Sequence, residues 1–466
     1  MFKKWFSETS NNKWVILLLL VGFVLRFSIF LSTPSYITFD NHFEPIMLWL
    51  KNGHIPLPNE CFQCYQPPLY YSVFYFLAQI KLWLGFEVSE YDKVLQFGHL
   101  IIGMATLLVS WLVIKQFKID KKAKLLSFAI LVFLPKHIYM SVMFSNDTLV
   151  YFSVVLVAYF LLKWKNKPTW SNSIFLGISI TAAVFSKGNG LVVLPATAAA
   201  VLLVLVVEKF QSSRFLKAVV IAFIPLLLYT PYVWQRHQLL GNPYKMNVDI
   251  FNIPMRQQPG AQFDYVSFKP WEFVKMPTIY EGNMHSFFTI IYSRMWVEGE
   301  AKFSVFIDHK VNENFWIEQS DWYGDYNSPI VLTPEMLTLK YRISNGILVI
   351  LGLLPLLSII IGLLISLKIS ITYFGKDSVI TLFLLLLVVG NIIGIYITSS
   401  NFPFYSFVKA AFFLVSIPAF LVFSAKGLEF LLKNRYSAIM TYTGIMLLLI
   451  GITIQVYLVV EGALYA

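Results

Sequence analysis

Long apolar runs recur along the whole chain and are separated by polar connections. Eleven of them are of about spanning length, because roughly 20 helical residues rise ~30 Å, the thickness of the hydrocarbon core of a bilayer. They lie at about 14–33, 94–115, 124–142, 149–163, 171–187, 189–207, 217–235, 343–367, 377–397, 405–425 and 437–460. The pattern therefore predicts an all-α polytopic membrane protein with about eleven transmembrane helices and juxtamembrane helices on its exoplasmic side.

A further apolar run, 67–84, opens with two prolines and carries Gln79 and Lys81 near its end. Basic residues decide whether it crosses, since Lys and Arg in short loops stay on the cytoplasmic side. They gather at 3–13, 115–124, 163–167, 209–217, 368–376 and 426–435, and are missing from 143–148 and 398–404. This alternation holds only if 67–84 does not cross, so we predict an aromatic-rich helix lying in the outer interface.

The same alternation places the N-terminus in the cytoplasm of a multi-pass protein, which we expect in the cell (inner) membrane. We divide the chain into an N-terminal transmembrane module at 1–235, with a first exoplasmic loop at 34–93, an exoplasmic loop or small subdomain at 236–342, and C-terminal transmembrane helices at 343–466. The first span is too long for the apolar core of a cleaved signal peptide and is interpreted as a retained helix.

Composition agrees with this assignment. Of 466 residues, 57% are hydrophobic and only 13% are charged, which is too little polar surface for a soluble protein. The net charge of +11 is concentrated in the predicted cytoplasmic loops, so we expect the membrane as a partner and no nucleic acid.

Asp40 is the first candidate for chemistry. It lies just beyond the first span, ahead of a short amphipathic helix that Pro45 can start and Gly53 can stop. An acid here can cap that helix or interact with its dipole. Glu44, immediately before Pro45, has the stronger claim to that role, which leaves Asp40 more available.

Asp147 is the second candidate, at the outer mouth between the spans 124–142 and 149–163. Together with Ser145 and Asn146 it can start the following helix. Alternatively, Asp147 meets Asp40 when the helices bundle, since both lie on the outer face. Two such carboxylates can share a divalent cation (Mg²⁺ or Mn²⁺), or one can act as a base while Asp147 holds the metal.

Two lysines lie on the predicted outer side, against the charge rule. Lys187 can complete a helix C-terminus, with Gly188 or Gly190 as the cap. Lys409 lies within the first turns of a span, where a charge is costly without a partner, and an anionic lipid headgroup would be such a partner. Arg26, inside the first span, is interpreted as a structural pairing within the bundle or as a side chain that snorkels outward.

The segment 236–342 carries Arg294 and Glu298 close to Tyr292 and Trp296. These charges can be solvated, or they can bind an acceptor or a sugar, since aromatic rings stack on sugars while acids and Arg bind hydroxyl or phosphate groups.

The two cysteines of the chain, Cys61 and Cys64, lie in the first outer loop. A zinc site would need a second pair of ligands. We predict a local disulfide, because compartments outside the cytoplasm are usually oxidising.

Several of these motifs together resemble the GT-C integral-membrane glycosyltransferases, and in particular the branch of the dolichyl-phosphate-mannose–protein mannosyltransferases and aminoarabinose transferases. The motifs are an Asp after the first span, the QPPLYY that follows the first juxtamembrane helix, the Asn146-Asp147 pair, SKGNGLVVLP at 186–195 and YSRMWVEGEAKF at 292–303. One departure from the family concerns its typical adjacent acidic pair in the first loop, which is here Asp40-Asn41, with Glu44 a turn later.

The resemblance implies inverting transfer of a sugar from a polyprenyl-phosphate-linked donor to a lipid, glycan or protein acceptor at the exoplasmic face. Asp40 then matches the base, Asp147 the organising or metal-binding acid, and Lys409 the phosphate-binding group. We add Lys187 to the candidates for the donor phosphate, and Glu44, Arg294 and Glu298 to those for the acceptor or sugar. The alternatives are a transporter or flippase of lipid-linked glycans, for which we find no repeated halves, a surface-glycan polymerase or ligase, and a non-catalytic scaffold.

Overall fold

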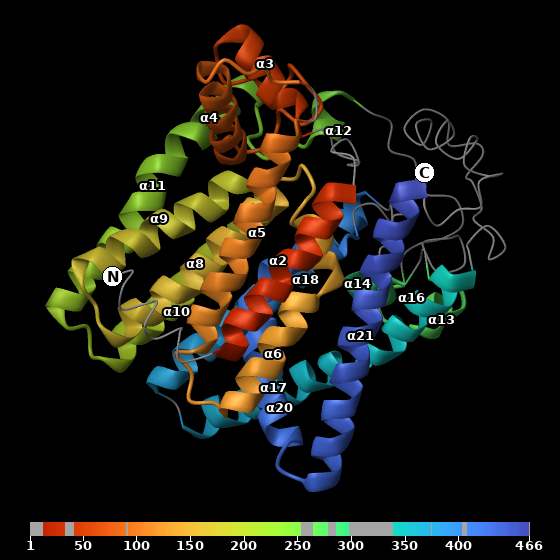
Figure 1. Ribbon diagram of the computed structural model, residues 1–466. Helices are drawn as coiled ribbons and strands as arrows, with labels where there is room; N and C mark the ends of the chain where they lie inside the picture. Colours follow the sequence, from red (N-terminus) through yellow and green to blue (C-terminus); the bar gives the residue numbers. More distant parts are fainter. Residues whose placement is uncertain are drawn as a thin grey trace.

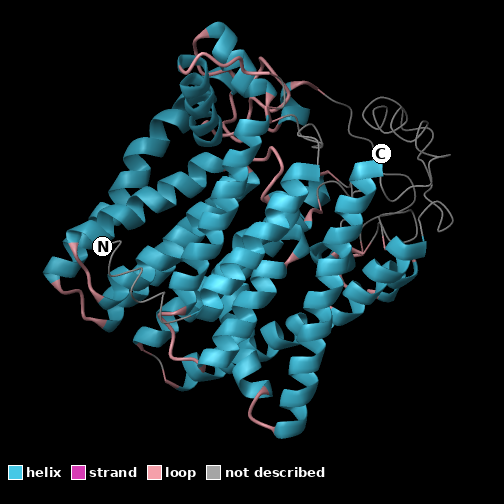
Figure 2. Cartoon of the chain, viewed as in Figure 1, coloured by secondary structure: helices cyan, strands magenta, loops and turns pink. Residues whose placement is uncertain are grey.

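The computed structural model describes residues 13–32, 42–89, 92–252, 264–277, 286–297, 339–373, 375–402 and 408–465, and the statements on structure below refer to these residues. They form helices joined by loops, and no strand occurs among them (Figures 1 and 2). The helices are α2 (Lys13–Ser32), α3 (Glu44–Asn52), α4 (Leu69–Trp83), α5 (Lys93–Ile114), α6 (Lys121–Phe133), α7 (Pro135–Met140), α8 (Asp147–Asn166), α9 (Trp170–Ser186), α10 (Val193–Val207), α11 (Ser212–Leu240), α12 (Asn247–Ile250), α13 (Trp271–Lys275), α14 (Phe287–Trp296), α16 (Leu339–Leu351), α17 (Leu353–Thr372), α18 (Lys376–Asn401), α19 (Ala410–Phe413), α20 (Ile417–Leu431) and α21 (Arg435–Tyr465).

The predicted spans are helical in the structure, and the all-α polytopic fold is confirmed. Within the described ranges, nine helical segments are long and apolar enough to cross a membrane. The predicted span 171–187 is the shorter α9, of 17 residues. The span 124–142 is divided into α6 and α7 at Leu134, which is extended (φ −59°, ψ 112°) because the following Pro135 disfavours helical geometry there.

The run 67–84 forms α4, whose 15 residues are too few for a full crossing. It packs against α3, α5 and α9 at one end of the bundle, and Figure 1 shows α3 and α4 together at the top of the molecule. Phe76 and Trp83 on α4 are 68% and 84% exposed, as expected for a helix that lies in a membrane interface. We call the end that carries α3, α4 and the turns 141–146 and 187–190 the outer end.

Arg26 explains how the broken segment α6–α7 is held against the first span. Its guanidinium is fully buried and donates to the carbonyl of Val132 at 3.0 Å, in the last turn of α6, where helical carbonyls lack partners. The same side chain lies 2.7 Å from His137 Nδ1 on α7. Arg26 therefore has the structural role within the bundle that we predicted as one alternative.

Candidate functional site

Asp147 and Lys187 form a buried ion pair at the outer end. Asp147 is the first residue of α8 and Lys187 follows the last residue of α9, so two neighbouring turns bring them together. Lys187 Nζ donates to Asp147 Oδ2 at 2.7 Å, and both side chains are less than a tenth exposed. Ser145 Oγ donates to the same oxygen at 3.0 Å. Lys187 itself occupies the C-cap position of α9, where we expected Gly188 or Gly190, and its ammonium group binds Asp147.

Phe412 connects Lys187 with Lys409. The ammonium of Lys187 lies 4.9 Å from the centroid of its ring, and that of Lys409 lies 5.8 Å from it. Lys409 directly precedes α19, and the ring of Phe412 belongs to that helix. Since aromatic rings attract cations, the ring of Phe412 interacts favourably with the ammonium groups of both lysines. Three of the predicted site residues, Asp147, Lys187 and Lys409, thus share one cluster.

Arg294 lies on α14, a helix that packs against α7, α16 and α19. The side chain is 1% exposed, so the prediction of a solvated charge is wrong for this residue. Trp296, on the same helix, occupies the space that a Cβ on Gly352 would need, at the junction of α16 and α17. α14 is therefore packed into the bundle through its own side chains, with Arg294 buried.

The first loop folds onto the turn that carries Asp147. Phe43 and Phe144 pack edge to face, with ring centroids 5.4 Å apart. A second interaction connects α4 with Asp147. Burial of Tyr70 on α4 and the negative charge of Asp147 both raise the pKa of Tyr70.

Two of the predicted site residues, Asp40 and Glu298, lie outside the described residues, and their roles stay predictions. Glu44 is described and begins α3, where an acid interacts favourably with the helix dipole. The N-cap of α3 is Phe43, however, so Glu44 does not occupy the capping position we expected for it. Gly53 ends α3 in the left-handed region (φ 73°), as predicted.

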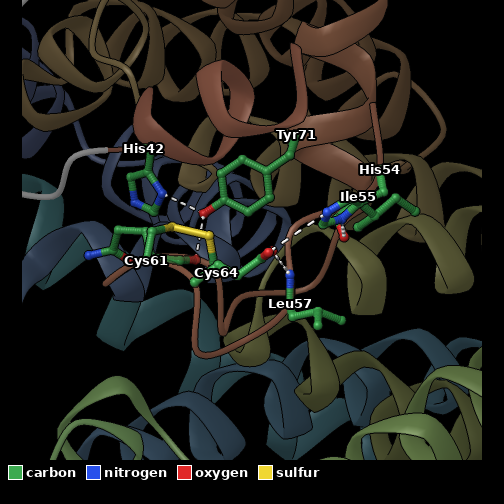
Figure 3. Close-up of a disulfide and its surroundings, with 9 residues drawn as sticks. His42, His54, Ile55, Leu57, Cys61, Cys64 and Tyr71 are labelled. Carbon is green, nitrogen blue, oxygen red and sulfur yellow. Dashed lines mark hydrogen bonds and ion pairs between the residues drawn. A yellow bond between two sulfur atoms is a disulfide. The ribbon is translucent and has the colours of Figure 1, made fainter. Parts of the chain in front are cut away.

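The predicted disulfide between Cys61 and Cys64 is present, and it shapes the loop between α3 and α4. Figure 3 shows it beside His42 and Tyr71. Tyr71 Oη donates to the carbonyl of Gln63, between the two cysteines, at 3.2 Å. Because its proton is used there, Tyr71 accepts from His42 Nδ1, 2.9 Å away. The loop thus fixes His42, which is two residues from Asp40.

Arg236 joins this loop to the long outer segment. Its guanidinium donates to the carbonyl oxygens of Tyr65 at 2.6 Å, Pro243 at 2.6 Å and Lys245 at 3.0 Å. Phe62 and Phe251 add a ring contact between the same two segments, with centroids 6.2 Å apart. The disulfide loop is consequently anchored to the end of α11.

Several residues of this region were missed by the sequence analysis. Tyr70, Tyr71, Phe144 and Phe412 belong to apolar or aromatic runs, where nothing separates a site residue from a packing residue. Lys187 and Asp147 did carry a signal, since they are opposite charges on the same predicted face. Arg236 was detectable in the same way, as a basic residue at the predicted outer end of a span.

Comparison with known proteins supports the predicted resemblance. Residues 73–234 match the model of the family described as dolichyl-phosphate-mannose-protein mannosyltransferase. Curated protein sequences give no match to the chain.

Solved structures match nearly the whole chain. The archaeal oligosaccharyltransferase AglB from Archaeoglobus fulgidus, in complex with an inhibitory peptide and a dolichol-phosphate, aligns over 98% of this chain with a TM-score of 0.53 and 16% identity. The Archaeoglobus fulgidus oligosaccharyltransferase in complex with Zn and sulfate aligns over 96%, with a TM-score of 0.51 and 15% identity. ArnT from Cupriavidus metallidurans in the apo state covers 90% of this chain and 78% of its own, at 14% identity and a lower TM-score of 0.39.

The present chain spans only 56% and 53% of the lengths of the two archaeal chains. At such identities the likeness concerns the fold. The predicted resemblance is thus confirmed, by the family pattern over residues 73–234 and by a described chain that has the fold of the GT-C integral-membrane glycosyltransferases.

Proposed function

We propose that this protein is an inverting glycosyltransferase that takes a sugar from a polyprenyl-phosphate-linked donor and places it on an acceptor at the exoplasmic membrane face. The observation that carries the proposal is the cluster of Lys187 and Lys409 around Phe412, with Asp147 bound to Lys187 and the first loop packed on Phe144 in the turn before Asp147. The archaeal relative was solved with a dolichol-phosphate, an anion of the same chemical class.

The charges of the cluster suit a phosphodiester. Lys187 is paired with Asp147, and Lys409 brings a second ammonium group to the ring of Phe412, so the cluster suits the single negative charge of the donor phosphate. The ammonium group of Lys187 lies near the same Phe412 ring as that of Lys409. It can therefore stabilise the additional negative charge that develops on the phosphate when its bond to the sugar breaks. Both lysines are therefore proposed as donor phosphate ligands.

The reaction proposed is a single displacement. A hydroxyl oxygen of the acceptor attacks the anomeric carbon and forms the new bond from the face opposite the phosphate. The bond between the anomeric carbon and the phosphate oxygen breaks, and its electron pair leaves with the polyprenyl phosphate. We propose Asp40 as the base that takes the hydroxyl proton, because Asp147 is already held by Lys187. Asp147 then organises the phosphate ligands.

The acceptor is proposed to approach from the outer segments. Glu44 on α3, Arg294 on α14 and Glu298 would bind the hydroxyl or phosphate groups of the acceptor or sugar. Arg294 is buried on a helix that packs against α19, and a guanidinium group binds phosphate or carboxylate groups well. Lipid, glycan and protein acceptors all remain within this proposal.

The described residues do not by themselves fit a divalent cation. Mg²⁺ and Mn²⁺ take several oxygen ligands, and Asp147 offers one oxygen, Oδ1, while its other oxygen binds an ammonium group. Among the described residues, no three His, Cys, Asp or Glu side chains gather as a metal site. We therefore derive no step through a metal ion.

The orientation proposed follows the lysine distribution, with the outer end exoplasmic. An oxidising compartment on that side would sustain the disulfide of Cys61 and Cys64. The membrane proposed is the cell (inner) membrane, because the polyprenyl carrier has to be reached from within the bilayer.

The test is transfer of labelled sugar by the purified protein from a panel of synthetic polyprenyl-phosphate hexoses and pentoses to lipid, glycan and peptide acceptors. We expect Lys409→Ala to raise the KM for the donor about 10- to 100-fold, since a hydrogen bond to a charged group is lost. Lys433→Ala, at an exposed lysine of the predicted cytoplasmic side, is the matched control. Absence of transfer from every donor, by folded protein, would contradict the proposed function.

Tyr71→Phe tests whether the disulfide loop positions Asp40. The change removes the hydrogen bonds to Gln63 and His42 but keeps the ring in its aromatic cluster. We expect kcat to fall about tenfold while the KM for the donor stays the same, because only the base moves. Tyr75→Phe, whose ring stacks on Trp49, is the control. An unchanged kcat in Tyr71→Phe would show that the loop does not position Asp40.

A further inference from the structure

Asn146 is buried, and its side chain has no hydrogen-bond partner in the part of the chain that the structure describes. Its side chain is fully inaccessible, and neither Oδ1 nor Nδ2 has a partner among the described residues. Asn146 is the N-cap residue of α8, a position where Asn usually accepts a hydrogen bond from the helix, yet it makes no such bond. Helix capping therefore does not account for this side chain.

Asn189 and Asp147 carry further polar atoms of the same kind. Both polar atoms of the Asn189 side chain and Oδ1 of Asp147 are buried without a partner in the described part of the chain. Asn189 lies between Lys187, which binds Asp147, and Gly190. A Cβ atom added to Gly190 would lie 3.1 Å from the side chain of Val150, in the first turn of α8. The turns that carry Asn146 and Asn189 are thus packed against each other.

Burying polar atoms without partners is costly, and in native proteins such groups usually meet an ordered water, an ion or a ligand, or serve a function. A carboxamide offers donors and an acceptor together, which matches the hydroxyl groups of a sugar. A cation could use only its oxygen and would be repelled by the neighbouring ammonium of Lys187. The arrangement therefore favours a polyhydroxylated ligand over a metal ion.

We propose, on the basis of the proposed function, that Asn146 and Asn189, with Oδ1 of Asp147, bind hydroxyl groups of the sugar that is transferred. The lysines beside them hold the phosphate of the donor, so the sugar attached to it is placed against the two asparagines. These residues then determine which sugar is accepted, and the lysines recognise the carrier.

The experiment compares Asn146→Leu and Asn189→Ala with the wild type in two measurements. One is the KM for the polyprenyl-phosphate sugar that the wild type transfers best from the panel. The other is binding of polyprenyl phosphate without a sugar. Each variant is expected to raise the KM for the sugar donor about tenfold and to leave the affinity for the bare carrier unchanged, because one or two hydrogen bonds to the sugar alone are lost.

Thermal unfolding separates this role from a structural one. Asn146→Leu removes buried polar atoms that lack a partner, so its Tm should be equal to or above that of the wild type. Asn345→Leu, at another buried asparagine with an unpartnered Nδ2, is the control and should not change the KM for the donor.

Deoxy analogues of the donor give the sharpest test. If Asn146 binds a given hydroxyl, loss of that hydroxyl and Asn146→Leu should have equal effects that do not add in combination. A lower Tm with unchanged donor KM would overturn the sugar subsite, and so would an equal loss of affinity for sugar donor and bare carrier. Failure of the wild type to use any polyprenyl-phosphate sugar would instead overturn the proposed function.

Discussion

Asp147→Asn is expected to lower sugar transfer at least about 100-fold and to destabilise the protein. The substitution leaves the ammonium of Lys187 buried without its counter-charge, and breaking one side of a buried pair typically costs about 3–5 kcal/mol. Lys187 also loses its fixed position beside the donor phosphate. Transfer from a labelled donor measures the first effect, and thermal or denaturant unfolding measures the second.

The double variant Asp147→Asn/Lys187→Met separates the two effects. With both charges removed, neither partner is left uncompensated, so much of the lost stability should return. Activity should not return, because the organising acid and a phosphate ligand are both gone. Wild-type turnover in the double variant would show that the pair is structural only, and would remove Asp147 and Lys187 from the site.

Asp40→Asn is expected to have the largest effect on the chemical step. Loss of a general base typically lowers kcat about 10²- to 10⁴-fold. The KM for the donor and the Tm should change little, because the amide has the shape of the carboxylate and the lysines proposed as phosphate ligands are intact. The measurement is kcat under saturating donor and acceptor.

Asp249→Asn is the matched control for Asp40→Asn. Asp249 is another acid of the predicted outer segments, exposed and bonded to the backbone amide of Met246. It should keep nearly wild-type turnover. If Asp40→Asn also kept full turnover, the proton would have to go to a different group, and the assignment of the base would be wrong.

The fold was largely predictable because two signals in the sequence extend along the whole chain. Apolar run length locates the spans, and the placement of lysines decides that 67–84 does not cross. What could not be predicted is which distant side chains meet. The break before Pro135 has a local cause, but the close approach of Trp296 to Gly352 joins residues more than fifty positions apart in sequence.

Of the residues at the candidate site, only the charged ones could be predicted from the sequence. Asp147, Lys187 and Lys409 are conspicuous because charges at the outer ends of spans are costly, and the structure brings them together. Asn146 looked like a helix cap, since capping and sugar binding use the same residue types. Only its burial without a partner distinguishes the two roles, and burial is a property of the folded chain.

Arg236 joins the disulfide loop to the segment after α11 through hydrogen bonds that tolerate substitution of the residues it contacts. All three of its acceptors on the two segments are backbone carbonyl oxygens, which are present whatever the side chains at Tyr65, Pro243 and Lys245. Substitutions at those three positions therefore leave the acceptors in place. The side chains on this surface can therefore change during evolution, toward new acceptors, while Arg236 keeps the backbone of the two segments in the same arrangement.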